Sequence, residues 1–151
     1  DDLVAGELMW GATKSILYGT IITLVISLFG LVDSPFIILA IPVLFLSGLI
    51  FAEISVIFVS IVPGIDYFNY FYTLFMTPMF LFSGIFFPLN NLPPIISKIA
   101  FFTPLYHLVN ICRSFSSGKL LVGTWDILWV FAVAIILAPY SFRLMRKRIM
   151  K

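Results

Sequence analysis

Charged residues are scarce in this chain of 151 residues. Asp, Glu, Lys and Arg make up 11% of the sequence, whereas 62% of the residues are hydrophobic. A soluble domain keeps about a quarter of its residues charged, so this chain lacks the side chains for a water-facing surface. The net charge of +2 also provides no basic field for nucleic acid. The composition predicts an integral membrane protein.

Residues that could act as nucleophiles, metal ligands or phosphate-binding groups are equally few. The chain has one cysteine, Cys112, and one histidine, His107, so an internal disulfide is excluded. We expect His107 at the membrane interface or in a hydrogen bond rather than as a ligand. The phosphate loop Gly-x-x-x-x-Gly-Lys-Ser/Thr is absent from the sequence. We therefore predict no catalytic, cofactor or metal site, and uphill transport would need a separate ATP-hydrolysing subunit.

Four apolar segments are long enough to cross a bilayer, which takes about 20 residues per crossing. Backbone groups in lipid must be hydrogen-bonded within the protein, so these segments are expected to be helices. The predicted fold is all-α, a single polytopic membrane domain over residues 1–151. The expected spans are residues 12–32, 36–62, 67–87 and 124–142. The acidic start without an initiator Met indicates the C-terminal part of a longer protein.

Basic residues predict the orientation of the spans. Five of the nine lie in the last nine positions, and Lys14 lies at the start of the first span. The positive-inside rule then places both ends in the cytoplasm, as an even number of spans requires. Lys98, Arg113 and Lys119 would fall on the outer side.

A proline-rich connector separates the third and fourth spans. Pro88 stops the third span, and Pro93 precedes two short amphipathic segments, residues 94–102 and 104–117. Pro104 suits the first position of a helix, with Thr103 as its N-cap. Two interpretations stay open. The segments form surface helices over a loop, or they form a functional re-entrant pair that dips into the membrane and returns.

Small and polar residues share one side of the third span at about 100° per residue. Such a stripe suits a helix–helix seam or a pathway for amphipathic molecules, and both hold if the pathway follows a subunit interface. A kink is expected at Thr77-Pro78, and Phe71, Phe75 and Phe82 lie on the opposite side. The stripe consists of Asn69, Thr73, Met76, Thr77, Phe80, Ser83 and Gly84.

Two further patterns concern the first and second spans. Small residues recur every four positions from Ser15 to Ser27, which predicts close packing against another helix. Glu53 is a carboxyl group inside the second span, where a charge is costly. It could pair with Lys14, be protonated by burial, or serve proton-coupled transport. We favour a structural role over proton coupling.

Several motifs resemble the permeases of the ABC-2 transporter family. They are PMFLFSGIFFPLNNLP at residues 78–93, TPLYH at 103–107, GELMWGAT at 6–13 and LYG at 17–19. The similarity covers essentially the whole chain. It is greatest to the bacterial branch that exports polysaccharides, drugs or lipo-oligosaccharides, and in particular to nodulation-type lipo-oligosaccharide exporters.

The resemblance implies a six-span permease of the bacterial inner membrane, of which this chain carries spans three to six. The segment around Glu7 would contact an ATP-binding subunit, and the short helices would be the re-entrant pair of the family. Two permease copies, set in membrane lipid, would enclose a pathway for an amphipathic small molecule or glycan. Glu53 stands where the family has a small residue.

Two other functional classes remain as alternatives. A membrane enzyme acting on lipid-linked sugars needs clustered acids or bases, and the chain offers only scattered His107, Arg113 and Asp126. A structural or assembly subunit would tolerate substitutions along the stripe from Asn69 to Gly84, whereas a transporter would not.

Overall fold

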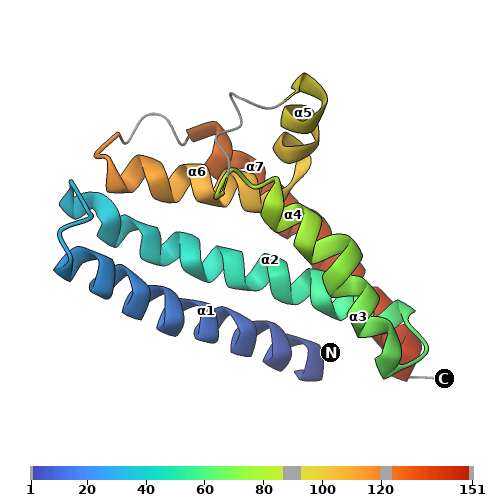
Figure 1. Ribbon diagram of the computed structural model, residues 1–151. Helices are drawn as coiled ribbons and strands as arrows, with labels where there is room; N and C mark the ends of the chain where they lie inside the picture. Colours follow the sequence, from blue (N-terminus) through green and yellow to red (C-terminus); the bar gives the residue numbers. More distant parts are fainter. Residues whose placement is uncertain (1, 87–92, 120–123, 150–151) are drawn as a thin grey trace.

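The computed structural model describes residues 2–86, 93–119 and 124–149, and these ranges hold helices and no strand (Figure 1). The all-α prediction is confirmed. Three helices are long and apolar enough to cross a membrane, α1 (Asp2–Leu28), α2 (Ala40–Ile61, preceded by η1, Pro35–Leu39) and α7 (Thr124–Ile149). By length and composition, the described part has up to four candidate spans if the bent pair α5 and α6 counts as one.

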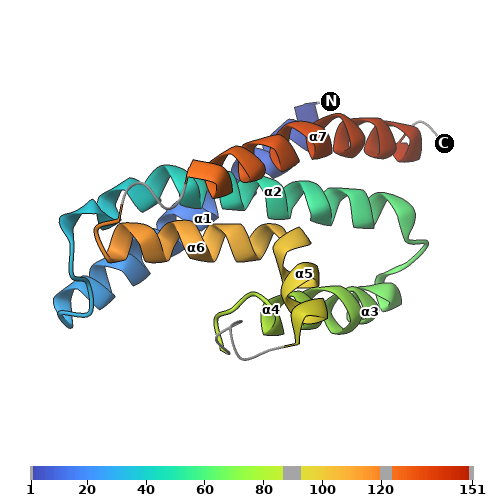
Figure 2. The ribbon, with the colours of Figure 1, turned by 90° about the horizontal axis from the view of Figure 1, so that it is seen from above.

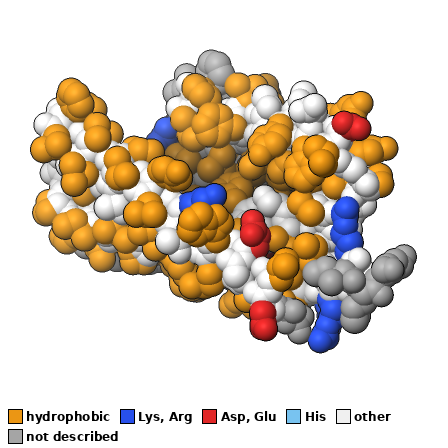
Figure 3. All heavy atoms as spheres, turned by 90° about the horizontal axis from the view of Figure 1, so that it is seen from below, with side chains coloured by type: hydrophobic (Ala, Val, Ile, Leu, Met, Phe, Trp, Pro, Cys, Tyr) orange, Lys and Arg blue, Asp and Glu red, His pale blue; other side chains and the backbone are white. Residues whose placement is uncertain are grey.

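Helix α2 lies at the centre of the bundle. It packs against α1 on one side and against α7 and α6 (Pro104–Ser116) on the other (Figures 1 and 2). The main core joins Ile50 of α2, Leu108 and Ile111 of α6, and Val130 of α7. Helix α1 packs mainly against α2 and also contacts α7, and the face of the molecule on which it lies is mainly hydrophobic with few charges (Figure 3). Such a surface suits lipid rather than water.

Helices α1 and α7 each extend beyond the expected span at one end, whereas α1 ends at Leu28, before residue 32, and η1 with α2 covers 35–61, close to the expected 36–62. Helix α1 begins at Asp2 rather than residue 12, because no proline interrupts residues 2–11 and an acidic first turn suits a helix N-terminus. Helix α7 continues past residue 142, because Arg146, Lys147 and Arg148 favour helix and complement its C-terminal dipole. The guanidinium of Arg148 also donates to the carbonyls of Val59 and Val62 at the end of α2. Both described ends of the chain lie at the same end of the bundle (Figure 1).

The third expected span is not one continuous α-helix. It consists of η2 (Ile65–Tyr67), α3 (Phe68–Tyr70), the π-helical η3 (Phe71–Met76) and α4 (Thr77–Leu81). Pro78 has no N–H for an α-helical hydrogen bond and crowds the preceding turn. The backbone N–H and the hydroxyl of Thr77 both bond to the carbonyl of Tyr72 instead, the hydroxyl at 2.9 Å. The predicted local distortion therefore takes the form of a π-turn. Residue 87, its expected end, lies outside the described residues.

The two short helices of the connector form where the sequence predicts them. Helix α5 (Pro94–Phe102) and α6 meet at an angle of 89°. Thr103 stands at the N-cap of α6, but its hydroxyl donates to the carbonyl of Ala100 at 2.7 Å and not to α6. Helix α6 lies beside α2 and α7 with its inner face in the core (Figure 2). This geometry favours the re-entrant pair over two surface helices.

Helix α6 buries more than one side. On a helical projection His107 and Ser114 lie on a different face from Leu108 and Phe115. The structure buries all four, together with Ile111. Because α6 lies between α2 and α7, both sides of the helix meet neighbours, and the hydroxyl of Ser114 bonds within the helix to the carbonyl of Asn110.

Arg113 ties α6 to the end of the third segment. After α4 the chain turns at Gly84, whose φ of 82° is a conformation that favours glycine. The carbonyl of the buried Gly84 accepts a hydrogen bond of 2.7 Å from Nη2 of Arg113. One bond thus positions the turn against α6.

Helices α1 and α2 approach each other closely through small residues. The hydroxyl of Ser15 donates to the carbonyl of Leu44 at 2.7 Å and lies 3.1 Å from that of Ser47. A Cβ atom on Gly48 would lie 2.7 Å from the Cα of Ala12 and 2.9 Å from the carbonyl oxygen of Gly11. The predicted packing of the first span is therefore intramolecular at Ser15, while Thr23 and Ser27 bond to their own helix.

We expect Gly48→Val to destabilise the α1–α2 pair by roughly 1–3 kcal/mol, because the added atoms overlap backbone that cannot rotate away. The measurement is the unfolding midpoint in detergent micelles. Gly6→Ala is the control, since nothing lies within 4 Å of a Cβ at that exposed helical position. Equal stability of Gly48→Val and the parent protein would contradict the close packing.

We expect Arg113→Met to destabilise the protein by about 1.5–3 kcal/mol, because a hydrogen bond from a charged donor is lost and the buried Gly84 carbonyl loses this partner. The same unfolding measurement applies. Lys98→Met is the matched control, because it removes an exposed cation from the neighbouring helix α5. Equal unfolding midpoints for Arg113→Met and Lys98→Met would show that the hydrogen bond from Arg113 to Gly84 does not stabilise the protein.

Candidate functional site

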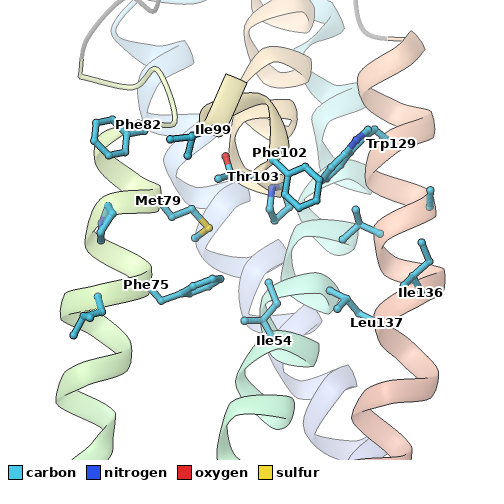
Figure 4. A pocket seen from close by; sticks show the side chains of 15 residues that line it. Ile54, Phe75, Met79, Phe82, Ile99, Phe102, Thr103, Trp129, Ile136 and Leu137 are labelled. Carbon is cyan, nitrogen blue, oxygen red and sulfur yellow. The ribbon is translucent and has the colours of Figure 1, made fainter. Parts of the chain in front are cut away.

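A pocket of about 700 Å³ lies between the third segment, α2, the α5–α6 bend and α7. In Figure 4, Phe75 and Met79 reach across from the third segment, Ile54 lies at the base, and Phe102 and Thr103 lie near the bend. The lining comprises Ile54, Leu74, Phe75, Pro78, Met79, Phe82, Ile99, Phe102, Thr103, Pro104, Trp129, Ala132, Val133, Ile136 and Leu137.

The chemistry of this pocket is apolar. Aliphatic and aromatic side chains form almost all of its wall. The hydroxyl of Thr103 already donates to the carbonyl of Ala100. Met79 is buried, and its flexible thioether can adjust to different shapes. The pocket therefore offers hydrophobic contact to a hydrocarbon chain and no counter-charge to an ionic group.

His107 fixes the end of the pocket at the bend. Its Nδ1 lies 2.6 Å from Oδ1 of Asp126 in α7, and its Nε2 lies 2.7 Å from the carbonyl oxygen of Phe101 in α5. Its ring stacks on Trp129, with centroids 4.5 Å apart and planes at 23°. One buried side chain of α6 thus contacts α5 and α7 and holds Trp129, which lines the pocket. The expectation that His107 is hydrogen-bonded is confirmed.

The predicted stripe of the third span divides between two environments. Asn69, Thr73 and Thr77 are exposed, whereas Ser83 and Gly84 are buried near the turn after α4. Met76, Thr77 and Phe80 line a second pocket of about 510 Å³, which also borders Phe51 and Leu105. The role of the stripe as a pathway or subunit seam stays a prediction.

Most residues of the main pocket were not predicted from the sequence. Phe75 and Phe82 line it, on the side of the third segment that the α-helical projection placed opposite the stripe. The prediction assigned the pathway to the polar and small residues of the stripe, whereas the wall of the main pocket is apolar. The available signal was the row of Phe side chains beside Pro78, a residue that disturbs the turn before it.

The prolines of the connector occupy different places. Pro88 lies outside the described residues. Pro93 stands directly before α5 at its N-cap, and Pro104 opens α6 and lines the main pocket. Of the predicted connector residues, the structure thus brings Pro104 and His107 to the pocket.

The acidic side chains predicted to matter lie away from this pocket. Glu53 is 4% exposed, and no described residue hydrogen-bonds to its Oε2. The pairing with Lys14 is not formed, because the Lys14 amine lies 4.8 Å from the centroid of the Trp10 ring. Glu7 is exposed on α1 and borders a groove between α1 and α2 with Trp10 and Lys14.

Comparisons with known proteins agree on one family. The model of the ABC-2 type transporter family matches residues 3–115. Nodulation protein J of Sinorhizobium fredii is 41% identical over 112 residues, which is 74% of this chain and 43% of that protein. Nodulation protein J of Rhizobium leguminosarum bv. viciae is 34% identical over 152 residues, 99% of this chain and 58% of that protein.

The chain spans about half the length of these curated relatives. No solved structure matches it. The family match covers the α1–α2 pair, the third segment and the α5–α6 bend, that is, most of the elements around the main pocket. The chain is a multi-pass membrane protein that belongs to the ABC-2 type transporter family.

Proposed function

We propose that this chain is the C-terminal part of the permease subunit of an ATP-driven exporter that moves an amphipathic lipo-oligosaccharide across the bacterial inner membrane. The observation that carries the proposal is the match to the ABC-2 type transporter family, together with relatives named nodulation protein J. The apolar pocket supports an amphipathic cargo, because it suits the hydrocarbon part of such a molecule.

ATP hydrolysis takes place on a separate ATP-binding subunit in this proposal. The sequence has no phosphate loop, while α1 runs without a break from Asp2 to Leu28. A continuous helix transmits a displacement along its length. In this proposal Glu7, exposed near the start of α1, contacts the ATP-binding subunit and passes its movement to the α1–α2 pair.

The orientation follows from the charged end of α7. Arg146, Lys147 and Arg148 lie in its last turn, and the positive-inside rule assigns them to the cytoplasm. The start of α1 lies at the same end of the bundle (Figure 1). The α5–α6 bend and its pocket then belong to the outer part of the pathway.

A second permease copy completes the pathway. The exposed polar side chains Asn69, Thr73 and Thr77 lie on the third segment, and Thr77 lines the second pocket. In lipid, polar and small side chains stabilise contacts between helices. We place the seam between two copies along this face.

The first test is co-purification from the native membrane. We expect the full-length protein to carry an ATP-binding subunit whose ATPase activity rises when lipo-oligosaccharide is added, because cargo and hydrolysis are coupled. A lipid-free oligosaccharide of the same sugars is the control. A stable complex without an ATP-binding partner would falsify the proposal and favour a structural or assembly subunit.

The second test fills the main pocket. We expect Ala132→Phe to reduce export at least several-fold, because its ring occupies space proposed for the hydrocarbon of the cargo. Ile135→Phe is the matched control on the same helix, since Ile135 is 70% exposed and outside the pocket. Export is measured as cargo released per cell at equal protein level. Equal export by both variants would remove the pocket from the pathway.

A further inference from the structure

The surroundings of His107 constrain its protonation. Nδ1 faces Oδ1 of Asp126 at 2.6 Å, and Nε2 faces the backbone carbonyl of Phe101 at 2.7 Å. A carbonyl oxygen only accepts hydrogen bonds, and so does an ionised carboxylate. A neutral imidazole has one N–H, so one of its nitrogens would point a lone pair at an oxygen lone pair. A doubly protonated ring satisfies both contacts.

A neutral pair would also satisfy both contacts if Asp126 carried the proton. Three features favour the ionised pair instead. Asp126 lies in the first turn of α7, where the helix dipole stabilises a carboxylate, and its side chain keeps 14% exposure. Phe101 offers one of the last carbonyls of α5, the negative end of that helix. The ring lies flat on the indole of Trp129, an arrangement that attracts a cation.

Among the described residues, the charge of the His107 ring is neutralised by no acidic side chain other than Asp126. The further described contacts of the ring are edge-on with the aromatic rings of Phe101 and Tyr106. Lys98 is exposed on α5, and Arg113 donates to Gly84. His107 itself lies in the first turn of α6, where the dipole of that helix opposes a cation. The charge on the ring therefore depends on Asp126.

We propose that His107 is an imidazolium and that its ion pair with Asp126 pins the α5–α6 bend to α7. The carbonyl of Phe101 needs this donor, because an unbroken helix would bring it the N–H of Leu105, and the 89° bend turns α6 away from the axis of α5. The ion pair also fixes the positions of Trp129 and Thr103, which line the apolar pocket. His107 is thus a positioning residue for that pocket.

The test measures the protonation of the ring directly. ¹⁵N-histidine labelling of the full-length protein in lipid nanodiscs reports the protonation of each histidine ring, and His107 is the single histidine of these 151 residues. The His107→Gln variant identifies the His107 signal by its loss. We expect two protonated ring nitrogens at pH 7. A ring with one protonated nitrogen and one bare nitrogen would overturn the proposal.

Asp126→Asn is the matched variant, because its amide keeps the size of the carboxylate and can donate to Nδ1. We expect the ring to become neutral, with the proton on Nε2 for the Phe101 carbonyl and a bare Nδ1. Both hydrogen bonds then survive without the charge. Retention of two protonated nitrogens in this variant would contradict the dependence of the charge on Asp126.

A separate measurement tests whether His107 holds the α5–α6 bend against α7. Spin labels at Lys98→Cys in α5 and Leu128→Cys in α7, in a Cys112→Ala background, report the distance between the two helices. Both labelled positions are exposed. We expect one narrow distribution for the parent and a broadened one for His107→Gln, whose single amide donor cannot reach both acceptors. An unchanged distribution in His107→Gln would show that His107 does not hold the bend.

Discussion

Backbone hydrogen bonding in an apolar medium is the constraint on which this structure depends. Where a helix is interrupted inside lipid, each freed N–H and carbonyl needs a new partner within the protein. The chain interrupts its helices at the π-turn before Pro78, at the turn around Gly84 and at the bend after Phe102. Thr77 bonds to Tyr72 at the first, Arg113 to Gly84 at the second, and His107 to Phe101 at the third. A side chain 29 residues away therefore completes the second break, and a side chain of the next helix completes the third.

The main pocket lies where these interruptions meet. Two straight helices in contact leave little space between them, whereas a π-turn and an 89° bend separate their axes. Pro78 and Pro104, which cause or accompany the breaks, both line the pocket. In the function that we propose, the pocket offers hydrophobic surface to the cargo, and the broken helices around it allow a change of shape. In the same proposal the α1–α2 pair, which is closely packed at Gly48, transmits movement.

Much of the fold could be predicted because its signals are local. The prolines correctly predicted where α5 and α6 start, because a residue without an N–H fits the first turn of a helix. Apolar length predicted α1, α2 and α7, although α1 begins earlier and α7 ends later than expected, because polar residues continue a helix as readily as apolar ones. The small residues around Ser15 predicted a close contact, which proved to be with α2. The distortion expected at Thr77-Pro78 is present, but its form as a π-turn was not predicted.

The sequence by itself determined that the chain is an all-α membrane protein of the ABC-2 type, because composition, apolar length and local motifs do not depend on the partners of a residue. Tertiary structure alone decided which side chains meet. His107 and Asp126 are 19 residues apart, and nothing in their local sequence shows that α6 returns beside the start of α7. The same holds for Phe75 and Trp129, which share a pocket because a π-turn and a bend bring their helices face to face. Contacts between distant residues depend on the path of the whole chain, so they appear only once it is folded.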